Sequence, residues 1–433
     1  MLYICTLLLF SIGFMGDKKA TAIFNPLTYP IYVMAKPIGA LCNLDCHYCY
    51  YLEKGELYRG ASLKMSDEIL EQYIKEYIEC QPTPNVLFTW HGGETLMRGV
   101  DFFRKALRLQ KQYAGGRAIS NSIQTNGVLL NDEWCRFLKD NQFLTGISLD
   151  GPEHIHDRYR RDKSGRGTFT RVMKGVELLQ KHGVEFNTLS VINDYSAKYP
   201  LEVYNFFKSI GSRYMQFSPI VERWGDRSDG LELLPPGERF DNIEMPPWCV
   251  SPEDYGNFYC TIFDEWVRKD VGRYFIQLFD STLAGWMGEQ PGVCIYAKMC
   301  GHAAVVEHNG DVFSCDHFVF PEYKLGNIRT KTITEMMLSR EQMKFGADKF
   351  NTLPRQCREC EFLHLCNGEC PKNRISKTFD GEAGLNYLCR GLHKFFNHSK
   401  PYMLYMVEQL KQELPPANVM RVAGKIKKGE IVL

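Results

Sequence analysis

The chain has 433 residues, roughly two to three times the usual length of a domain, so more than one module or one large α/β barrel with additions is expected. Hydrophobic residues at 44% and charged residues at 24% are close to the average for globular proteins, which argues against intrinsic disorder and a multi-span membrane protein. The formal net charge of +1 gives no electrostatic indication of nucleic-acid binding.

The chain begins with an apolar run over residues 2–14, the one candidate for a targeting signal. A secretory signal needs a basic segment before its apolar run, whereas here Lys18 and Lys19 follow it, and Met15 offers a later start. We therefore interpret residues 1–28 as an N-terminal extension, with a signal or membrane anchor as the alternative. We expect a cytoplasmic protein with neither a membrane nor a nucleic acid as its partner.

Residues 29–250 are expected to form the first domain. From residue 30 to about 218 they alternate short β-branched runs with longer amphipathic stretches, which is the pattern of βα units around a parallel sheet, and residues 224–249 predict a loop. Strands are predicted over residues 31–35, 86–90, 118–124, 144–149, 185–191 and 213–217. Helices are predicted over residues 66–78, 100–113, 132–138, 169–181 and 201–209, the first with Ser66 as a cap. Six such units predict an incomplete α/β barrel.

Beyond residue 250 the pattern changes. Residues 251–290 predict a helical connector with helices over 252–268 and 276–287. Residues 291–395 are rich in turns, contain a predicted hairpin over 305–313, and hold eight of the 16 cysteines, which predicts a second domain held together by cofactors. A closing helix over 401–414 and a basic tail are expected within residues 396–433.

The first cysteine cluster, Cys42-x3-Cys46-x2-Cys49, follows the first predicted strand, at the rim where α/β barrels keep their chemistry. Three thiolates can bind three irons of a [4Fe-4S] cube and leave the fourth iron open to an exogenous ligand. The alternative is a structural zinc site, which needs a fourth Cys or His nearby. Many cysteines in a large chain favour metal or redox centres over a disulfide framework.

The second constellation comprises the eight cysteines between residues 294 and 389. They are Cys294, Cys300, Cys315, Cys357, Cys360, Cys366, Cys370 and Cys389. Eight thiolates are the number that two clusters with four cysteine ligands each need, with two zinc sites as the alternative. Their spacing leaves open which cysteines share a cluster. The remaining cysteines are interpreted as small buried hydrophobes: Cys5, Cys80, Cys135, Cys249 and Cys260.

The first cluster, with Tyr48 before its last cysteine, resembles the radical S-adenosylmethionine (SAM) enzymes. This resemblance implies a partial (β/α)6 radical SAM barrel in which Tyr48 belongs to the cofactor-binding loop. It also implies that Gly92, Gly93 and Glu94 bind the methionine amino group of SAM. Here the motif reads GGET where GGEP is commoner. An ordinary glycine-rich turn is the alternative for this motif.

Three further rim positions take a role from the same resemblance. Ser148 and Arg160 would bind the methionine carboxylate, and the loop near Val221 would pack on the adenine. A helix-capping hydroxyl is the alternative for Ser148. Arg158 and Arg161 compete with Arg160 for its role.

The second constellation resembles the C-terminal domain called SPASM, which carries two auxiliary [4Fe-4S] clusters. This resemblance implies that one cluster is held by Cys294, Cys300, Cys315 and Cys370. It implies that the other is held by Cys357, Cys360, Cys366 and Cys389. Together with the first cluster, the expected cofactors are three [4Fe-4S] clusters and SAM.

Among these enzymes the sequence is most similar to the anaerobic sulfatase-maturating enzymes, on residues 36–37 at the entry to the cysteine loop and on residues 90–96, 124–127 and 309–318. The resemblance implies an oxidoreductase that converts a cysteine or serine of a sulfatase to Cα-formylglycine through a 5'-deoxyadenosyl radical. It implies as partners an unfolded or nascent sulfatase polypeptide and an electron donor such as ferredoxin or flavodoxin. The alternatives are a SPASM enzyme that forms thioether or carbon-carbon crosslinks and a non-enzymatic electron carrier or zinc scaffold.

Asp316 follows an auxiliary-cluster cysteine and by resemblance is the catalytic general base. Formation of an aldehyde removes two electrons and two protons, whereas the radical removes only one hydrogen atom, so a base has to take the other proton. The alternative is a carboxylate that orients the cluster loop. His317 is a second candidate base, and Asp280 is either a substrate contact or a charge on a helix face.

Overall fold

The computed structural model describes residues 25–26, 30–235 and 243–431. The chain divides into two compact units. One, the barrel unit, comprises the described residues up to Val250 together with Gly301–Gly346. The other, the cysteine-rich unit, comprises Ser251–Cys300 and the described residues from Ala347 onward.

The barrel unit is built on parallel strands that alternate with helices. Its first six strands are β1 (Tyr32–Lys36), β2 (Asn85–Trp90), β3 (Ala118–Thr125), β4 (Leu144–Ser148), β5 (Phe186–Ile192) and β6 (Tyr214–Pro219). Each pairs in parallel with the next. All six match predicted strands to within two residues at either end, so the predicted partial barrel is confirmed.

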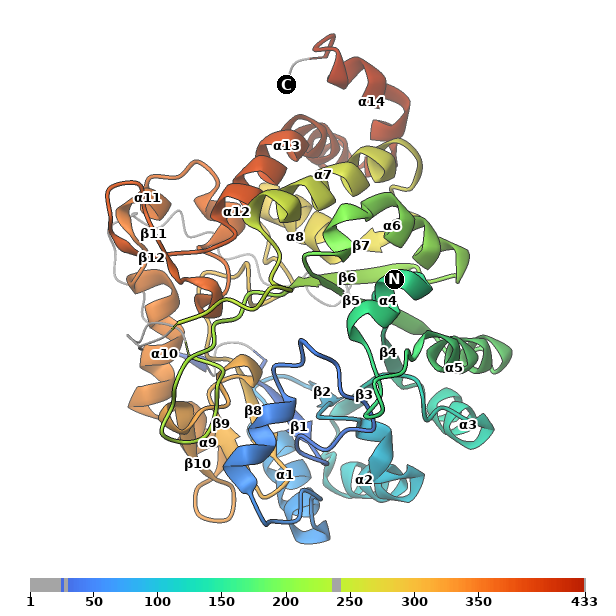
Figure 1. The fold of residues 1–433 in the computed structure, drawn as a ribbon, viewed down its shortest axis with the longest axis vertical. Helices are drawn as coiled ribbons and strands as arrows, with labels where there is room; N and C mark the ends of the chain where they lie inside the picture. The colour runs from blue at the N-terminus through green and yellow to red at the C-terminus, as the bar shows by residue number, and fades with distance from the viewer. Residues whose placement is uncertain (1–24, 27–29, 236–242, 432–433) are drawn as a thin grey trace. The chain divides into compact units, whose positions relative to one another are not determined.

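The helices between these strands lie outside the curved row of strands (Figure 1). They are α1 (Asp67–Glu79), α2 (Val100–Tyr113), α3 (Asp132–Asp140), α4 (Glu153–Tyr159), α5 (Phe169–Lys181) and α6 (Pro200–Ser209). The predicted cap of α1 is present, since Ser66 Oγ accepts a hydrogen bond from Ile69 N at 3.3 Å. The short helix α4 was not among the predicted helices.

Aromatic packing joins α1 to the strands beneath it. Tyr73 and Tyr77 stack on one another and contact Phe88 edge-on, and Phe88 stacks on Trp90. The Tyr73 hydroxyl donates to the Val33 carbonyl at 2.7 Å, so this buried aromatic side chain also satisfies its polar end. Burial of these side chains on one face of α1 fixes the helix against β1 and β2.

The predicted hairpin over residues 305–313 is present, as β8 (Ala303–Glu307) and β9 (Asp311–Phe313), and β10 (Lys324–Asn327) adds a third antiparallel strand. It does not stand apart from the barrel, because β8 pairs in parallel with β1 and Lys36 lies opposite Glu307. The sheet of this unit therefore runs β10-β9-β8-β1-β2-β3-β4-β5-β6. This arrangement brings the segment after β9 to the end of β1. The unit also contains α9 (Ile333–Met337).

The cysteine-rich unit is mainly helical. Its elements include α7 (Pro252–Lys269), β7 (Phe275–Ile276), α8 (Gln277–Trp286), α11 (Arg355–Arg358), α12 (Leu363–Cys366), β11 (Ser376–Lys377), β12 (Ala383–Leu385), α13 (Cys389–Lys411) and α14 (Val419–Lys427). A Cβ on Gly256 of α7 would lie 2.9 Å from the Gly391 backbone of α13, so glycine allows these two helices to cross closely. Helix α10 (Arg340–Asn351) includes residues of both units.

The predicted closing helix over 401–414 is wrong at its start. We interpreted Pro401 as a first helical residue, but α13 begins at Cys389 and contains Pro401 in its interior. The predicted basic tail is also wrong in part, because residues 419–427 form the amphipathic helix α14.

No helix among the described residues is long and apolar enough to cross a membrane. The apolar run over residues 2–14 lies outside the described residues.

Candidate active site

The loop that carries Cys42, Cys46 and Cys49 follows β1 and is fixed first by the backbone of the Gly-Gly-Glu segment. Gly93 N donates to the Gly39 carbonyl at 2.7 Å, and Glu94 N donates to the Leu41 carbonyl at 2.9 Å. A Cβ on Gly93 would lie 2.0 Å from the Leu41 oxygen, so only glycine allows this approach. The segment is therefore more than a turn, since it determines where the residue before Cys42 lies.

Two other rim segments hold the same loop. Asp45 N donates to the Arg161 carbonyl at 2.8 Å, and His47 N donates to the Tyr159 carbonyl at 3.1 Å, which fixes the loop to the end of α4. From the rim of β3, Asn126 Nδ2 donates to Asn43 Oδ1 at 2.8 Å. The cysteine loop thus has backbone or side-chain partners after β2, β3 and β4.

The three thiols of this loop are half-buried and unpaired with one another as disulfides. Burial, together with the neighbouring thiols of the loop, raises the pKa of the Cys42 and Cys46 thiols to about 12. Thiolates in such a place need positive charge beside them, which bound iron supplies. The donor set therefore fits an iron-sulfur cluster held by three cysteines.

Glu94 is buried and its carboxylate joins two rim segments. Oε1 accepts from Leu96 N at 3.0 Å and from the Thr125 hydroxyl at 2.6 Å, and Oε2 accepts from Asn126 N at 2.8 Å. Burial raises the pKa of this carboxyl, and the three hydrogen bonds oppose that effect. A carboxylate has about four acceptor sites, so one remains for an ammonium group.

Ser148 lies at the end of β4, where its Oγ accepts from Gln124 Nε2 at 2.8 Å. The alternative as a helix cap is wrong, because α4 begins at Glu153 with Pro152 as its N-cap. The Ser148 hydroxyl hydrogen is left to donate elsewhere.

Arg160 is buried, and its Nε lies 3.1 Å from Asp150 Oδ2, which also accepts a hydrogen bond from the Tyr48 hydroxyl. The hydrogen bond from Tyr48 to Asp150 joins the cysteine loop to the segment that follows β4. Val221 is buried after β6, and the adjacent Ile220 packs against Tyr48. Tyr48, Arg160 and the segment at Val221 therefore lie together.

Asp316 follows β9 and lies next to the end of β1. Its Oδ1 lies 2.6 Å from Lys36 Nζ, and its Oδ2 accepts from the Tyr50 hydroxyl at 2.6 Å. Burial raises the pKa of this carboxyl, but the Lys36 ammonium together with the His91 and His317 rings outweighs burial and holds the pKa below its usual value. The carboxylate is therefore ionised at neutral pH and can accept a proton.

His317 lies beside Tyr50, with ring centroids 5.3 Å apart, so this second candidate base belongs to the same cluster of side chains. Asp280 lies in α8 of the cysteine-rich unit, where burial alone raises its pKa to about 7. Asp280 is half-buried on this helix, and the choice between a substrate contact and a charge on a helix face stays a prediction.

The cysteine-rich unit contains all but one of the second set of eight cysteines, and Cys315 lies in the barrel unit. The partition into two clusters thus draws on both units and stays a prediction. Among the described residues, no three His, Cys, Asp or Glu side chains surround a point as ligands of a single metal ion. A site for one metal ion needs its ligands around a single point, whereas in an iron-sulfur cluster each thiolate binds a different iron atom.

Three buried charged residues near these cysteines were missed from the sequence. Lys349 Nζ donates to the Cys294 and Ile295 carbonyls at 2.6 and 2.7 Å. Arg374 donates to the Gly368 carbonyl at 3.1 Å and to the Lys349 carbonyl at 2.6 Å. Glu369 accepts from Asn386 and Asn373. Lys349 lies in α10, and Glu369 and Arg374 lie outside helices and strands, but a single buried charged residue gives no periodic signal in either setting, so no pattern indicates its burial.

Of the cysteines outside the two sets, Cys80, Cys135 and Cys260 are buried, as predicted. Cys249 is only half-buried, and its thiol accepts from Glu222 N at 3.4 Å, so its interpretation as a buried hydrophobe is wrong. Cys5 lies outside the described residues.

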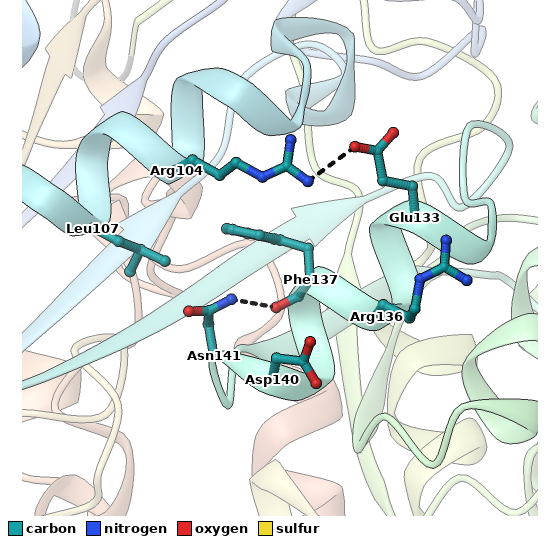
Figure 2. A pocket seen from close by; sticks show the side chains of 7 residues that line it. All are labelled: Arg104, Leu107, Glu133, Arg136, Phe137, Asp140 and Asn141. Carbon is teal, nitrogen blue, oxygen red and sulfur yellow. Dashed lines mark hydrogen bonds and ion pairs between the residues drawn. The ribbon is translucent and has the colours of Figure 1, made fainter.

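A surface hollow between α2 and α3 is separate from these residues (Figure 2). It is lined by Arg104, Leu107, Glu133, Arg136, Phe137, Asp140 and Asn141. Arg104 points toward Glu133 at 3.0 Å, so charges of opposite sign pair within the hollow (Figure 2). Its lining comes from helices on the outside of the barrel, and the candidate site residues are not among them.

Comparison with known proteins agrees with this geometry. Residues 37–207 match the radical SAM superfamily, and residues 294–361 match the iron-sulfur cluster-binding domain SPASM. The chain is 58% identical over 404 residues to the serine-type anaerobic sulfatase-maturating enzyme of Bacteroides thetaiotaomicron, covering 93% of this chain and 97% of that one. The chain belongs to the anaerobic sulfatase-maturating enzymes.

More distant members of this family match over a similar length. The cysteine-type anaerobic sulfatase-maturating enzyme of Clostridium perfringens is 31% identical over 390 residues, which cover 88% of this chain and all of that one. The solved structure "Native anSMEcpe with bound AdoMet and Cp18Cys peptide" matches with a TM-score of 0.76 and 30% identity, over 88% of this chain and 99% of that chain. The predicted family, fold class and enzyme class are confirmed, and the matched domains imply iron-sulfur clusters and SAM.

Proposed function

We propose that this enzyme oxidises a serine side chain of a sulfatase polypeptide to Cα-formylglycine. The family supports the reaction, and the preference for serine is supported by the 58% identity to a serine-type enzyme, against 31% to a cysteine-type one. The observation that carries the reaction is Asp316, a carboxylate ionised by its contact with Lys36 at the rim of the barrel.

We assign the eleven cysteines of the two sets to three [4Fe-4S] clusters, grouped as the family resemblance implies. Cys42, Cys46 and Cys49 would hold the cluster that binds SAM, and the loop they share supports this assignment because its thiols lie close enough to raise one another's pKa. Glu94, with one acceptor site left, would bind the amino group of SAM. The rest of SAM would be surrounded by other residues of the rim, namely Tyr48, the backbone of Gly92 and Gly93, Ser148, Arg160 and the segment at Val221.

When bound, SAM and its cluster supply the abstraction of one hydrogen atom from the β-carbon of the serine. Oxidation of the CH₂OH group to an aldehyde also removes the hydroxyl proton and one electron. Asp316 takes that proton, and the auxiliary clusters, when bound, would supply the acceptor for the electron. With a cysteine substrate the same steps yield a thioaldehyde, which water converts to the aldehyde.

The protein orients the substrate hydroxyl and excludes water while the reaction proceeds. The side chain of Asp316 keeps 17% of its surface exposed, so a substrate can reach it without unfolding of the loop. Ferredoxin or flavodoxin as the electron donor, and a cytoplasmic location, stay predictions.

The test is incubation of the reduced enzyme and SAM with two sulfatase-derived peptides that differ only in serine or cysteine at the target position. Mass spectrometry should find formylglycine, formed faster from the serine peptide. A crosslinked peptide would support the alternative SPASM chemistry. If SAM is cleaved while both peptides stay unaltered, the result would contradict both formylglycine formation and crosslinking. Faster conversion of the cysteine peptide would contradict the serine preference alone.

A further inference from the structure

Lys36 is the last residue of β1 and is completely buried. Its ammonium group contacts three other segments of the barrel unit. Nζ lies 2.6 Å from Asp316 Oδ1, 3.2 Å from His91 Nδ1 and 4.0 Å from the centroid of the Tyr51 ring. A buried ammonium is costly unless it is paired, and here a carboxylate, an imidazole nitrogen and an aromatic face surround it.

The two oxygens of Asp316 consequently have different partners. Oδ1 is bound by Lys36, whereas Oδ2 accepts one hydrogen bond from the Tyr50 hydroxyl and keeps a second lone pair. The Lys36 side chain has no exposed surface, and that of Asp316 has 17%. The carboxylate is therefore held from inside the barrel and reachable from outside.

His91 extends this contact to the Gly-Gly-Glu segment. Its Nδ1 accepts from Gly92 N at 2.8 Å and faces Lys36 Nζ at 3.2 Å. Burial and the neighbouring Lys36 ammonium together lower the pKa of His91 to about 3, so the ring is neutral and Nδ1 accepts from both. Lys36 thus connects Asp316, through His91, to the backbone of the segment assigned to SAM.

We propose that Lys36 is a positioning residue for the general base, an inference that rests on the proposed function. By holding Oδ1 it aims the free lone pair of Oδ2 at the substrate hydroxyl, and through His91 it fixes the base relative to the site of hydrogen abstraction. Because the Lys36 side chain has no exposed surface, its effect on the reaction is exerted through Asp316. Displacement of a reacting group by about 1 Å can lower a rate on the order of a hundredfold, so such a residue affects turnover strongly.

The first measurement compares Lys36→Met with the wild-type holoenzyme. The quantity measured is formylglycine formed per 5'-deoxyadenosine released, with iron content and SAM binding determined on the same samples. We expect this ratio to fall about tenfold or more, while iron content and SAM binding stay within about twofold. Such uncoupling separates a role in positioning the base from a general loss of structure.

Lys54→Met is the matched control. Lys54 is also buried in the barrel unit, where its Nζ lies 3.4 Å from Glu53 and 3.5 Å from the centroid of the Phe320 ring. It has a carboxylate and an aromatic face as partners, as Lys36 has, but its partners lie outside the proposed active site. Its replacement should leave the product ratio at the wild-type value.

A double variant tests whether Lys36 acts through Asp316. In an Asp316→Asn background there is no base to position, so adding Lys36→Met should change residual formylglycine by less than about twofold. Multiplication of the two single effects would overturn the proposal, as would a Lys36→Met enzyme with the wild-type ratio. If Lys36→Met does not fold, Lys36→Gln is judged by the same ratio and the same double variant. A wild-type enzyme that forms no formylglycine would instead contradict the proposed function.

Discussion

Asp316 has the contacts of a base that is kept ionised, with Lys36 on one oxygen and Tyr50 on the other. Asp316→Asn keeps the size of the side chain and removes the charge. Because loss of a general base typically costs about a hundred- to ten-thousandfold, formylglycine formation should fall by that factor. The release of 5'-deoxyadenosine should continue, so quantification of both products by mass spectrometry measures the uncoupling.

The alternative role of Asp316, as a carboxylate that orients the loop after Cys315, gives a different result. In that case iron content would fall together with activity, because groups around metal ligands contribute to metal binding. An Asn variant with normal iron and normal formylglycine would contradict both roles and leave His317 as the nearest candidate base.

Gly93 fixes the path of the chain before Cys42 by steric exclusion. Because a Cβ there would lie 2.0 Å from the Leu41 oxygen, Gly93→Ala should displace the cysteine loop and lower the iron bound at that loop. Iron analysis and SAM binding measure this effect.

The matched control is Gly55→Ala, where a Cβ would meet only the Ala40 methyl group at 3.7 Å, an ordinary van der Waals contact. Neither glycine has a positive φ angle, so the two variants differ in the space that is available to the added methyl group and not in backbone strain. Normal iron content and SAM binding in Gly93→Ala would show that the loop tolerates the displacement.

Single site residues could be predicted where their spacing in the sequence is typical of a cofactor site. Cys42, Cys46 and Cys49 were identified from their spacing, and Asp316 from its place beside Cys315 in a family segment. Lys36 was not identified as a site residue, because its role depends on the pairing of β8 with β1, a contact between segments about 270 residues apart. Lys36 could have been identified as a lysine at the end of a predicted buried strand, because a buried charge needs a partner.

At the scale of elements, the barrel strands and most helices were predictable because hydrophobic period and capping agree locally, as at Ser66 of α1. The start of α13 was not, because Pro401 favours a helix start in isolation and only tertiary packing places it inside. Helix α4 is too short to show a period.

Helix α4 is held by His156, which makes the stability of this element depend on pH. His156 is buried, with Nε2 2.9 Å from the Thr168 hydroxyl and Nδ1 accepting from Asp150 N at 3.4 Å. Burial lowers its pKa well below the usual value, and Arg160 lowers it further. Below about pH 6.5 the unfolded chain binds a proton here that the folded chain does not, so stability is lost as pH falls.

From pH 7.5 to pH 5.5 this single group should lower the free energy of unfolding by about 1.4 kcal/mol. His156→Gln is neutral at both pH values, so its loss over the same range should be smaller than that of the wild type by this amount. Urea unfolding at both pH values measures the difference. An equal loss in the two proteins would mean that His156 becomes protonated in the folded state.

At the scale of the whole molecule, the sequence order of segments differs from their grouping in space. Residues 301–346 follow the first part of the cysteine-rich unit but belong to the barrel unit, since β8 pairs with β1. Hydrophobic pattern predicts the hairpin but cannot select its partner strand, because any parallel edge satisfies the same pattern. This return of the chain places Cys315 and Asp316 in the unit that contains the first cysteine loop.

The distribution of cysteines leads to a prediction about iron. If eleven cysteines hold three cubes, anaerobically reconstituted protein should contain about twelve irons, four for each cube. Replacement of Cys42, Cys46 and Cys49 by alanine should remove about a third of the iron and abolish SAM cleavage. The triple variant Cys80→Ala, Cys135→Ala, Cys260→Ala is the control, because these buried cysteines belong to neither set, and it should keep all of the iron. Zinc at two per chain with only about four irons would contradict the auxiliary clusters, because each tetrahedral zinc would then occupy four of the second set of cysteines.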